Sequence, residues 1–378
     1  MNTSGHINER IVFLMPSKAP DGPVGGYKVV YEYANRLAAD GFQVTIVYPL
    51  TYRFSEQSPA DRLKTIPRAL KWIVKGISCK KWFALDPRVC EKAVLSLNER
   101  DVPEGDVYVA TALHTAFYLA QYKIPSRRKF YLIQGFENWR DSDTTVYDSY
   151  KAGLHNIVIS DWLHRHVTAA GAEAEIIKNG FDFNYFKLSV PIEERDPKCV
   201  SMMWHSEERK GGPLGLKVLQ TVKERHPDLK VIMFGVPERP TGMPEWVEYH
   251  CRPDRETHNM IYNRSAIYLA PSYQEGWGLT VGESMICGAA VVCTDTLGFL
   301  EMVTDGKNGL ISPCGEAEML TANVCRLIED PELRIAIARE GNLRIREFSW
   351  ERSYDRLKAL IRNSLLETET KKQVRSDS

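Results

Sequence analysis

Short apolar runs alternate with glycine-rich loops and amphipathic segments in the first half of the chain. Residues 11–15 form an apolar run typical of a buried parallel strand. A loop rich in glycine and proline follows, and residues 27–39 carry apolar positions at helical spacing up to Gly41. With a second strand at 43–48, this order predicts one Rossmann-type unit. Further strand-like runs follow at residues 107–110, 130–134, 156–160 and 175–178.

The same pattern restarts near residue 199. A strand-like run is followed by a Lys-Gly-Gly loop, a helical segment and another strand-like run, at residues 199–204, 210–212, 214–225 and 230–235. Strands at 266–270 and 289–293 enclose a helix at about 280–287. Two successive units of matching order predict an α/β fold with two Rossmann-like domains. The irregular, charged residues 182–198 have the composition of an interdomain linker.

Composition narrows the functional class. The chain has 378 residues, enough for two domains, and its 49 basic and 49 acidic side chains cancel. This balance gives no global reason to expect nucleic-acid binding. The eight cysteines do not have the spacing of metal ligands. Residues 1–10 lack the apolar core of a signal peptide, and no apolar run reaches the length of a membrane span. We therefore expect a cytoplasmic protein.

Residues 272–285 carry the most specific chemistry in the chain. They follow a strand and open a helix, so the helix start offers free N–H groups to an anion. Gly276 and Gly278 lack Cβ atoms and let the backbone approach a ligand closely. Glu275 and Glu283 are placed to accept hydrogen bonds from sugar and ribose hydroxyls.

Two glutamates eight residues apart that enclose Gly-aromatic-Gly-Leu resemble the signature of retaining glycosyltransferases of family 4. The following residues fit as well, from Gly288 to Val292, at Gly298 and Glu301, and from Asp305 to Leu310. The resemblance covers residues 11–350 and implies the GT-B fold, in which two Rossmann-like domains have parallel sheets that face a central cleft.

The family implies domain boundaries and roles. We expect an acceptor-side domain at 1–182, a donor-binding domain at 183–349, a helix at 350–366 that packs back on the first domain, and a polar, disordered tail at 367–378. Glu275 would contact the donor sugar, and Glu283 the ribose, although a carboxylate in the first turns of a helix also stabilises the helix dipole. Backbone amides of Gly276, Trp277, Gly278 and Leu279 would face the donor.

Lys210 precedes Gly211 as in the family's diphosphate-binding pair, where a cation neutralises the leaving diphosphate. The family usually has an arginine five residues earlier, where this chain has His205. Arg209 either supplies the second charge or points to solvent.

Three features of the first domain match weaker family elements. Gly25 and Gly26 resemble the glycine pair after the first strand, and the alternative is an ordinary loop. His114 follows the strand at 107–110, where some members carry an active-site histidine, and the alternative is a structural histidine. Glu137, within Gln134 to Glu137, is a candidate for acceptor hydroxyls, against the alternative of a surface carboxylate.

Residues 61–83 form a basic, aromatic, amphipathic segment interrupted by Pro67. Such a helix can lie on an anionic membrane, which suggests a lipid-linked or membrane-proximal acceptor and a peripheral position on the inner membrane face. The alternative is a helix that packs its apolar face on its own domain.

The resemblance implies transfer of a hexosyl or deoxyhexosyl group from a nucleotide-diphosphate sugar to a glycan or lipid-linked acceptor, with retention and without a metal or other cofactor. Two alternatives stay open at this point. One is a sugar-nucleotide epimerase or hydrolase on a related fold, and the other is a non-catalytic partner that binds sugar nucleotides.

Overall fold

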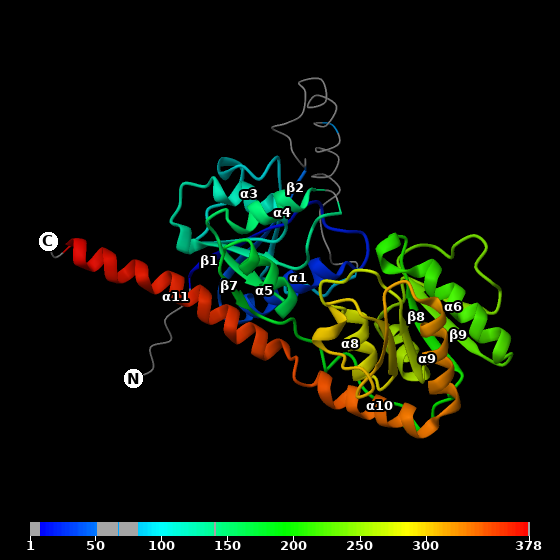
Figure 1. Cartoon of the computed structure of the whole chain (residues 1–378). Helices are drawn as coiled ribbons and strands as arrows, with labels where there is room; N and C mark the ends of the chain where they lie inside the picture. Colours follow the sequence, from blue (N-terminus) through cyan, green and yellow to red (C-terminus); the bar gives the residue numbers. More distant parts are fainter. Residues whose placement is uncertain (1–7, 51–66, 68–81, 140, 377–378) are drawn as a thin grey trace, which may run out of the picture. The chain divides into compact units, whose positions relative to one another are not determined.

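The computed structural model describes residues 8–50, 67, 82–139 and 141–376, and the chain divides into two compact units. Unit 1 runs to Lys178 and takes up the chain again from Glu351, whereas unit 2 is Asn179–Trp350. Both units are drawn in Figure 1, and each is described here by itself.

Unit 1 is built on a parallel sheet of seven described strands in the order β3-β2-β1-β4-β5-β6-β7. Strands β1 and β4, at its centre, pair through Val12 and Tyr108. Helices α1, α3, α4 and α5 connect the strands, and α11 adds to this unit from the end of the chain. The elements are β1 Arg10–Leu14, α1 Gly25–Ala39, β2 Gln43–Pro49, β3 Cys90–Val94, β4 Val107–Ala110, α3 Leu113–Ala120, β5 Lys129–Ile133, α4 Asp143–Tyr150, β6 His155–Val158, α5 Asp161–Ala169, β7 Ala174–Ile176 and α11 Trp350–Ser376.

Unit 2 has a parallel sheet of six strands in the order β10-β9-β8-β11-β12-β13. Helix α6 packs with α9, and α8 packs with α7 and α10, so helices cover the strands in two groups. Figure 1 shows α6 and α9 together beside β8. The elements are β8 Cys199–Trp204, α6 Gly212–Arg225, β9 Lys230–Gly235, β10 Val247–Cys251, α7 Arg255–Arg264, β11 Ile267–Ala270, α8 Leu279–Ile286, β12 Ala290–Thr294, β13 Leu310–Ser312, α9 Ala317–Glu329 and α10 Pro331–Ile345.

The central strands are apolar because both of their faces are covered. Every residue of β4, β5, β11 and β12 is buried. In unit 2, Val200, Met202 and Leu269 of the sheet join Leu219 of α6 and Leu320 of α9 in one apolar core. This is the pattern of a parallel sheet between helical layers, as the unbroken apolar runs predict.

Each sheet has one topological switch point, where the order of its strands reverses. In unit 1 the first strand, β1, lies next to β4, and in unit 2 the corresponding strand, β8, lies next to β11. Loops leaving these neighbouring strands diverge to opposite sides, and ligands of open α/β sheets bind in the crevice that results. The loops after β1, β4, β8 and β11 are therefore the candidate ligand-binding loops.

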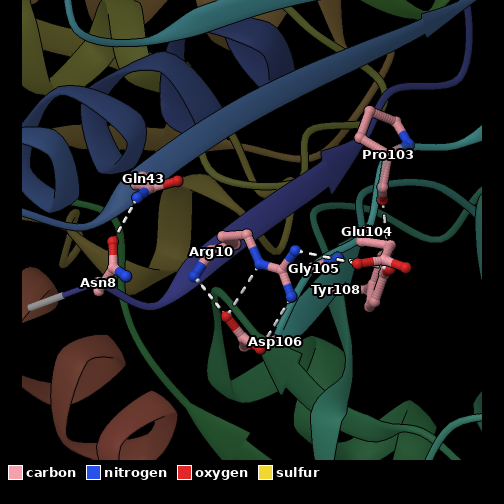
Figure 2. A network of polar contacts seen from close by, with 8 residues as sticks. All are labelled: Asn8, Arg10, Gln43, Pro103, Glu104, Gly105, Asp106 and Tyr108. Atoms are coloured by element: carbon pink, nitrogen blue, oxygen red, sulfur yellow. Dashed lines mark hydrogen bonds and ion pairs between the residues drawn. The ribbon is translucent and has the colours of Figure 1, made fainter.

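The opposite, amino-terminal edge of the unit 1 sheet is held by a polar network (Figure 2). The Arg10 amide and Nε donate to Asp106 Oδ2 at 2.9 and 3.3 Å, and Arg10 Nη1 lies 3.1 Å from Glu104 Oε2. The Gly105 amide donates to the Tyr108 hydroxyl at 2.7 Å. These bonds join the starts of β1 and β4 and have a structural role.

Two expectations need correction. Helix α1 begins at Gly25, so the glycine pair forms the first helical turn and does not precede the helix. Residues 182–198 belong to unit 2, where Arg195 anchors them: it is buried and donates to backbone oxygens of Val190 and Ser265, both at 2.9 Å. The charged composition of this segment gave no sign that its arginine would be satisfied by carbonyl groups.

The last helix is longer than expected. Helix α11 continues to Ser376, through most of the tail for which disorder was expected. The tail is polar, but it is rich in Glu, Lys and Gln, which have high helix propensity. Most of the basic segment at 61–83 lies outside the described residues. Of its aromatic residues, Trp82 packs against Tyr31 of α1 with tilted rings, whose centroids are 5.6 Å apart.

Candidate functional site

The loop after β8 positions Lys210 at the start of α6. A 3-10 turn, Glu208–Lys210, leads into Gly211, which is the N-cap of α6 and has φ +66°. A Cβ atom at Gly211 would lie 2.0 Å from the carbonyl oxygen of Pro271. Glycine is therefore required both by the backbone conformation and by the contact with the end of β11.

The structure brings Lys210 and Glu275 together from the two loops at the unit 2 switch point. Lys210 Nζ lies 2.7 Å from Glu275 Oε2, and both side chains are largely shielded. The hydroxyl of Ser272 donates to Glu275 Oε1 at 2.9 Å. Backbone bonds reinforce this junction, because Arg209 O accepts from Tyr273 N at 2.8 Å. Both carboxylate oxygens of Glu275 are thus held in place.

Helix α8 begins directly after this loop. Its N-cap, Gly278, has φ +102°, and a Cβ atom there would lie 2.5 Å from the Phe299 ring. The first helical residue is Leu279, and amides of a first turn lack intrahelical partners. Gly298 packs against the same loop, since its Cβ would lie 2.6 Å from the carbonyl oxygen of Glu275. The expected backbone positions around Gly276 therefore form one fixed loop.

Two helix N-termini and one ammonium group meet the requirements of an anion site. Because β8 and β11 are adjacent and parallel, α6 and α8 start at the same edge of the sheet. Each N-terminus carries a partial positive charge and N–H donors. Lys210 adds a full charge beside Glu275, a carboxylate suited to hydroxyl groups. This set of groups suits a ligand that has both phosphates and a sugar.

The side chain of Trp277 faces the interior of unit 2. The indole is 3 % exposed and packs edge-on against Phe348, with ring centroids 5.4 Å apart. The side chain of Trp277 therefore anchors the loop to the interior of unit 2, and only the Trp277 backbone can contact a ligand. The sequence motif alone did not show in which direction this aromatic ring points.

Glu283 lies in α8 and is buried. Its Oε2 accepts a hydrogen bond from the Tyr262 hydroxyl of α7 at 3.3 Å. Burial, with the nearby Glu283 carboxylate, raises the pKa of Tyr262, so this phenol stays a donor. Tyr262 thereby orients the carboxylate, a role that its place in the sequence did not suggest.

His205 and Arg209 are not equivalent substitutes for the arginine of the family pattern. Burial lowers the pKa of His205, and its Nδ1 accepts from the Glu207 amide at 3.0 Å. His205 is therefore neutral at pH 7 with its proton on Nε2, where it can donate a hydrogen bond but adds no charge. The guanidinium of Arg209 pairs with Glu207 at 2.5 Å.

In unit 1, the glycine pair and the loop after β5 are tied together. Gln134 Nε2 donates to the Gly26 carbonyl oxygen at 3.1 Å, and a Cβ on Gly26 would come within 3.5 Å of that amide group. Gly25 opens α1, so both glycines place backbone at the unit 1 switch point.

His114 and Glu137 also reach this region, from α3 and from the loop after β5. His114 Nε2 lies 2.9 Å from Asp141 Oδ2, with both side chains mostly shielded. Glu137 Oε2 accepts from the Leu113 amide at 3.0 Å and so caps the start of α3. Burial raises the pKa of the Glu137 carboxyl to about 7, the nearby Asp141 adding to the effect. The capping bond is a structural role for Glu137 that the motif did not reveal.

Ser272, Tyr262 and Asp141 contact candidate residues but were not singled out in the sequence. Ser272 opens the motif and follows a strand, which is a usable signal. Asp141 and Tyr262 lie 27 and 21 residues from their partners, so only the folded loops reveal the pairs.

The described residues contain neither a membrane-spanning helix nor a cluster of metal ligands. No helix among them has both the length and the apolar character to cross a membrane. Within the same residues, no three His, Cys, Asp or Glu side chains are grouped so that they could hold a metal ion.

The strand orders of the two sheets are those of an α/β protein with the GT-B fold, in which two Rossmann-like units are built on parallel sheets. Residues 189–344 match the family model described as glycosyl transferases group 1, which covers most of unit 2. The match agrees with the resemblance that the motif at residues 272–285 indicated.

Curated relatives match part of the chain, from 28 % to 57 % of it. A phosphatidyl-myo-inositol mannosyltransferase of Mycolicibacterium smegmatis is 25 % identical over 209 residues, 52 % of this chain and 54 % of the relative. A lipopolysaccharide core biosynthesis mannosyltransferase of Rhizobium leguminosarum is 35 % identical over 106 residues, 28 % of this chain and 30 % of the relative. The chain spans about half the length of the first of these relatives.

Solved structures share the fold over nearly the whole chain. Sucrose-phosphate synthase from Thermosynechococcus elongatus has a TM-score of 0.67 and 16 % identity, covering 98 % of this chain and 100 % of that one. Anabaena HepE, solved with UDP and glucose, has a TM-score of 0.71 and 16 % identity, covering 94 % of this chain and 100 % of HepE. At this identity the likeness establishes the fold.

Proposed function

We propose that this protein is a glycosyltransferase that moves a hexosyl or deoxyhexosyl group from a nucleotide-diphosphate sugar to a glycan or lipid-linked acceptor. The observation that carries the proposal is the Lys210–Glu275 pair, 2.7 Å apart at the switch point where α6 and α8 begin. A cation, two helix N-termini and a hydroxyl-binding carboxylate match the two halves of such a donor.

The donor side is assigned to unit 2. Lys210 and the first amides of α6 and α8 bind the diphosphate, and neutral His205 donates through Nε2. Glu275 accepts from sugar hydroxyls, held by Ser272, and Glu283 accepts from the ribose. The site requires no metal, because the charge on the leaving diphosphate is balanced by Lys210 and the amides.

The transfer step is the one that family 4 implies, and membership of that family is part of the proposal. The bond between the anomeric carbon and the diphosphate oxygen breaks while the acceptor hydroxyl oxygen bonds to the same carbon on the same face. The acceptor proton passes to an oxygen of the leaving phosphate. Lys210 stabilises the negative charge that develops on this group, so its effect is greatest in the transition state.

Names of relatives support the substrate classes. Two relatives are called mannosyltransferases, one for a phosphatidylinositol and one for lipopolysaccharide core, and HepE was solved with UDP and glucose. We assign the acceptor to unit 1, near His114. A cytoplasmic protein that binds the inner membrane face through residues 61–83 would suit a lipid-linked acceptor, and co-sedimentation with anionic vesicles at low salt tests that position.

The function is tested with a panel of UDP, GDP, ADP, TDP and their common sugar conjugates. A nucleotide that binds the folded protein raises its melting temperature by mass action. One nucleotide family should do so in the wild type and in Lys217→Ala, which removes an exposed lysine of α6. Lys210→Ala should weaken the shift.

Turnover of the selected donor completes the test. Loss of the transition-state charge contact in Lys210→Ala should lower kcat about 100-fold to 1,000-fold, whereas Lys217→Ala should keep wild-type turnover. Normal kcat in Lys210→Ala would contradict the assigned site. Rapid donor conversion without any acceptor would indicate an epimerase or hydrolase, and binding without turnover would indicate a non-catalytic partner.

A further inference from the structure

One large aromatic side chain next to the unit 1 candidates is held at the surface. Trp139 follows Glu137 by two residues and is 50 % exposed. Its six-membered ring lies over Gly135, 3.6 Å from the position that a Cβ atom would take there. Trp139 is the most exposed aromatic side chain in the described part of the chain, ahead of Tyr273 at 44 %.

The loop that carries Trp139 is fixed at four points. Gln134 donates to Gly26 O at 3.1 Å, and the Leu113 amide donates to Glu137 at 3.0 Å. Asn138 Nδ2 donates to Asp143 Oδ1 at 3.0 Å, and Asp141 pairs with His114 at 2.9 Å. These bonds hold the described residues of the loop in place without a ligand, so binding on the indole costs little to order them.

Polar side chains of the loop that carries Trp139, and of the helix bonded to it, suit a ligand with many hydroxyls. The carboxylates of Glu137 and Asp141 and the amide of Gln134 come from the same loop, and His114 comes from α3. Hydroxyl groups can donate to such oxygens and accept from such nitrogens. A binding site usually combines an apolar surface with a few polar groups that fix orientation.

We propose that Trp139 is a stacking platform for a sugar ring of the acceptor and so determines acceptor specificity; this inference rests on the proposed function. One face of a pyranose ring presents C–H groups, and the negative face of an indole attracts them. Hydroxyls at the ring edge then meet Glu137, Asp141 and His114. The acceptor therefore ends in a sugar, whether that sugar belongs to a free glycan or to a lipid-linked one.

Binding of sugars is measured first, without any donor. Methyl glycosides of mannose, glucose, galactose and rhamnose are titrated while tryptophan fluorescence is recorded. One series should shift the emission to shorter wavelength in the wild type, because stacking shields an exposed indole from water. The shift should disappear in Trp139→Phe and in Trp139→Leu, and should persist in Leu343→Ala, which trims an exposed leucine of unit 2.

Kinetics then separate stacking from a structural role. Trp139→Leu should raise the acceptor KM about tenfold, whereas Trp139→Phe, which keeps a ring, should stay within about threefold. The donor KM and the rate of donor hydrolysis without acceptor should stay unchanged in both variants. An unchanged acceptor KM in Trp139→Leu, or a parallel change in donor KM, would overturn the proposal.

Octyl glycosides of the same sugars show whether the indole contacts the sugar ring or an attached alkyl chain. Equal weakening of methyl and octyl glycosides in Trp139→Leu supports stacking on the sugar ring, and weakening of the octyl series alone would show that the indole contacts the alkyl chain and overturn it. If the wild type binds no nucleotide sugar, the proposed function fails, but the fluorescence titration still decides whether Trp139 binds sugars.

Discussion

Glu275 and Glu137 are carboxylates in opposite electrostatic settings. Glu275 accepts from an ammonium group and from a hydroxyl, so both of its oxygens are satisfied in the charged form. Glu137 has a single backbone donor in a desolvated place, and burial raises the pKa of its carboxyl to about 7. Glu137 therefore changes charge near neutral pH.

The raised pKa of Glu137 predicts how the stability of unit 1 depends on pH. The folded state favours the protonated carboxyl, so this contribution is complete below the unfolded pKa of 4.5 and is lost as pH rises through about 7. It amounts to no more than about 3 kcal/mol. Glu137→Gln keeps an acceptor for the Leu113 amide and removes the titration.

Denaturant unfolding at pH 5 and at pH 8 checks this prediction. The wild type should lose stability relative to Glu137→Gln between the two pH values, and the variants should be closest at pH 5. Comparison of the two proteins removes the contribution of all other titrating groups. A constant difference across this range would show that the pKa of Glu137 is not raised.

At the level of residues, the sequence indicated candidate site residues but not the side chains that contact them. The motif placed Lys210 and Glu275 on loops after separate strands, and parallel strands bring such loops to one edge. The ring direction of Trp277 and the pair His114–Asp141 depend on side-chain packing and loop shape. No spacing rule along the chain contains that information.

At the level of elements, the turn from β8 into α6 depends on Gly211. Replacement by alanine forces a left-handed conformation and a contact with Pro271 O at 2.0 Å. Gly242 is the matched control, since it has φ +82° but nothing within 4 Å of a Cβ. Gly242→Ala therefore carries only the conformational cost.

Gly211→Ala should lower the free energy of unfolding by about 3 kcal/mol or more, against about 1 kcal/mol for Gly242→Ala. Because the contact also moves Lys210, the first variant should lose nucleotide binding, whereas the second should keep it. Thermal unfolding with and without nucleotide measures both effects. Equal destabilisation would mean that the loop relaxes away from Pro271 without cost.

Buried central strands were the elements that sequence predicted well. Their unbroken apolar runs reflect cover on both faces, as in β4, β11 and β12. Three of the four edge strands, β3, β10 and β13, were missed. Strands β3, Cys90–Val94, and β10, Val247–Cys251, are mostly exposed or half-buried, so they lack the unbroken apolar runs of the central strands.

At the level of the whole molecule, the chain returns to unit 1 after unit 2. Tyr354 donates to Asp40 Oδ2 at 2.6 Å, Lys358 pairs with the same carboxylate, and Ser353 donates to Lys178 O at 2.6 Å. Asp40 is the C-cap residue of α1. One carboxylate thus ties the last helix to an element from the start of the chain.

Removal of this carboxylate should loosen α11. Asp40→Ala leaves Tyr354 and Lys358 without it, at a cost of about 1–3 kcal/mol. Hydrogen exchange followed by mass spectrometry should show faster exchange in residues 351–366 and in α1, with unit 2 unchanged. Asp228→Ala, which removes an exposed pair with Lys198 in unit 2, is the control. Faster exchange throughout the protein would indicate general destabilisation.

Because the chain returns to unit 1, the two units become complete during synthesis in the opposite order to that in which they begin. Unit 2 is continuous from Asn179 to Trp350, so all of its strands are available before α11 is made. Unit 1 starts first but waits for residues from Glu351 onward, although domains usually fold in the order of their translation. The second half of this protein can therefore reach its native fold before the first half is complete.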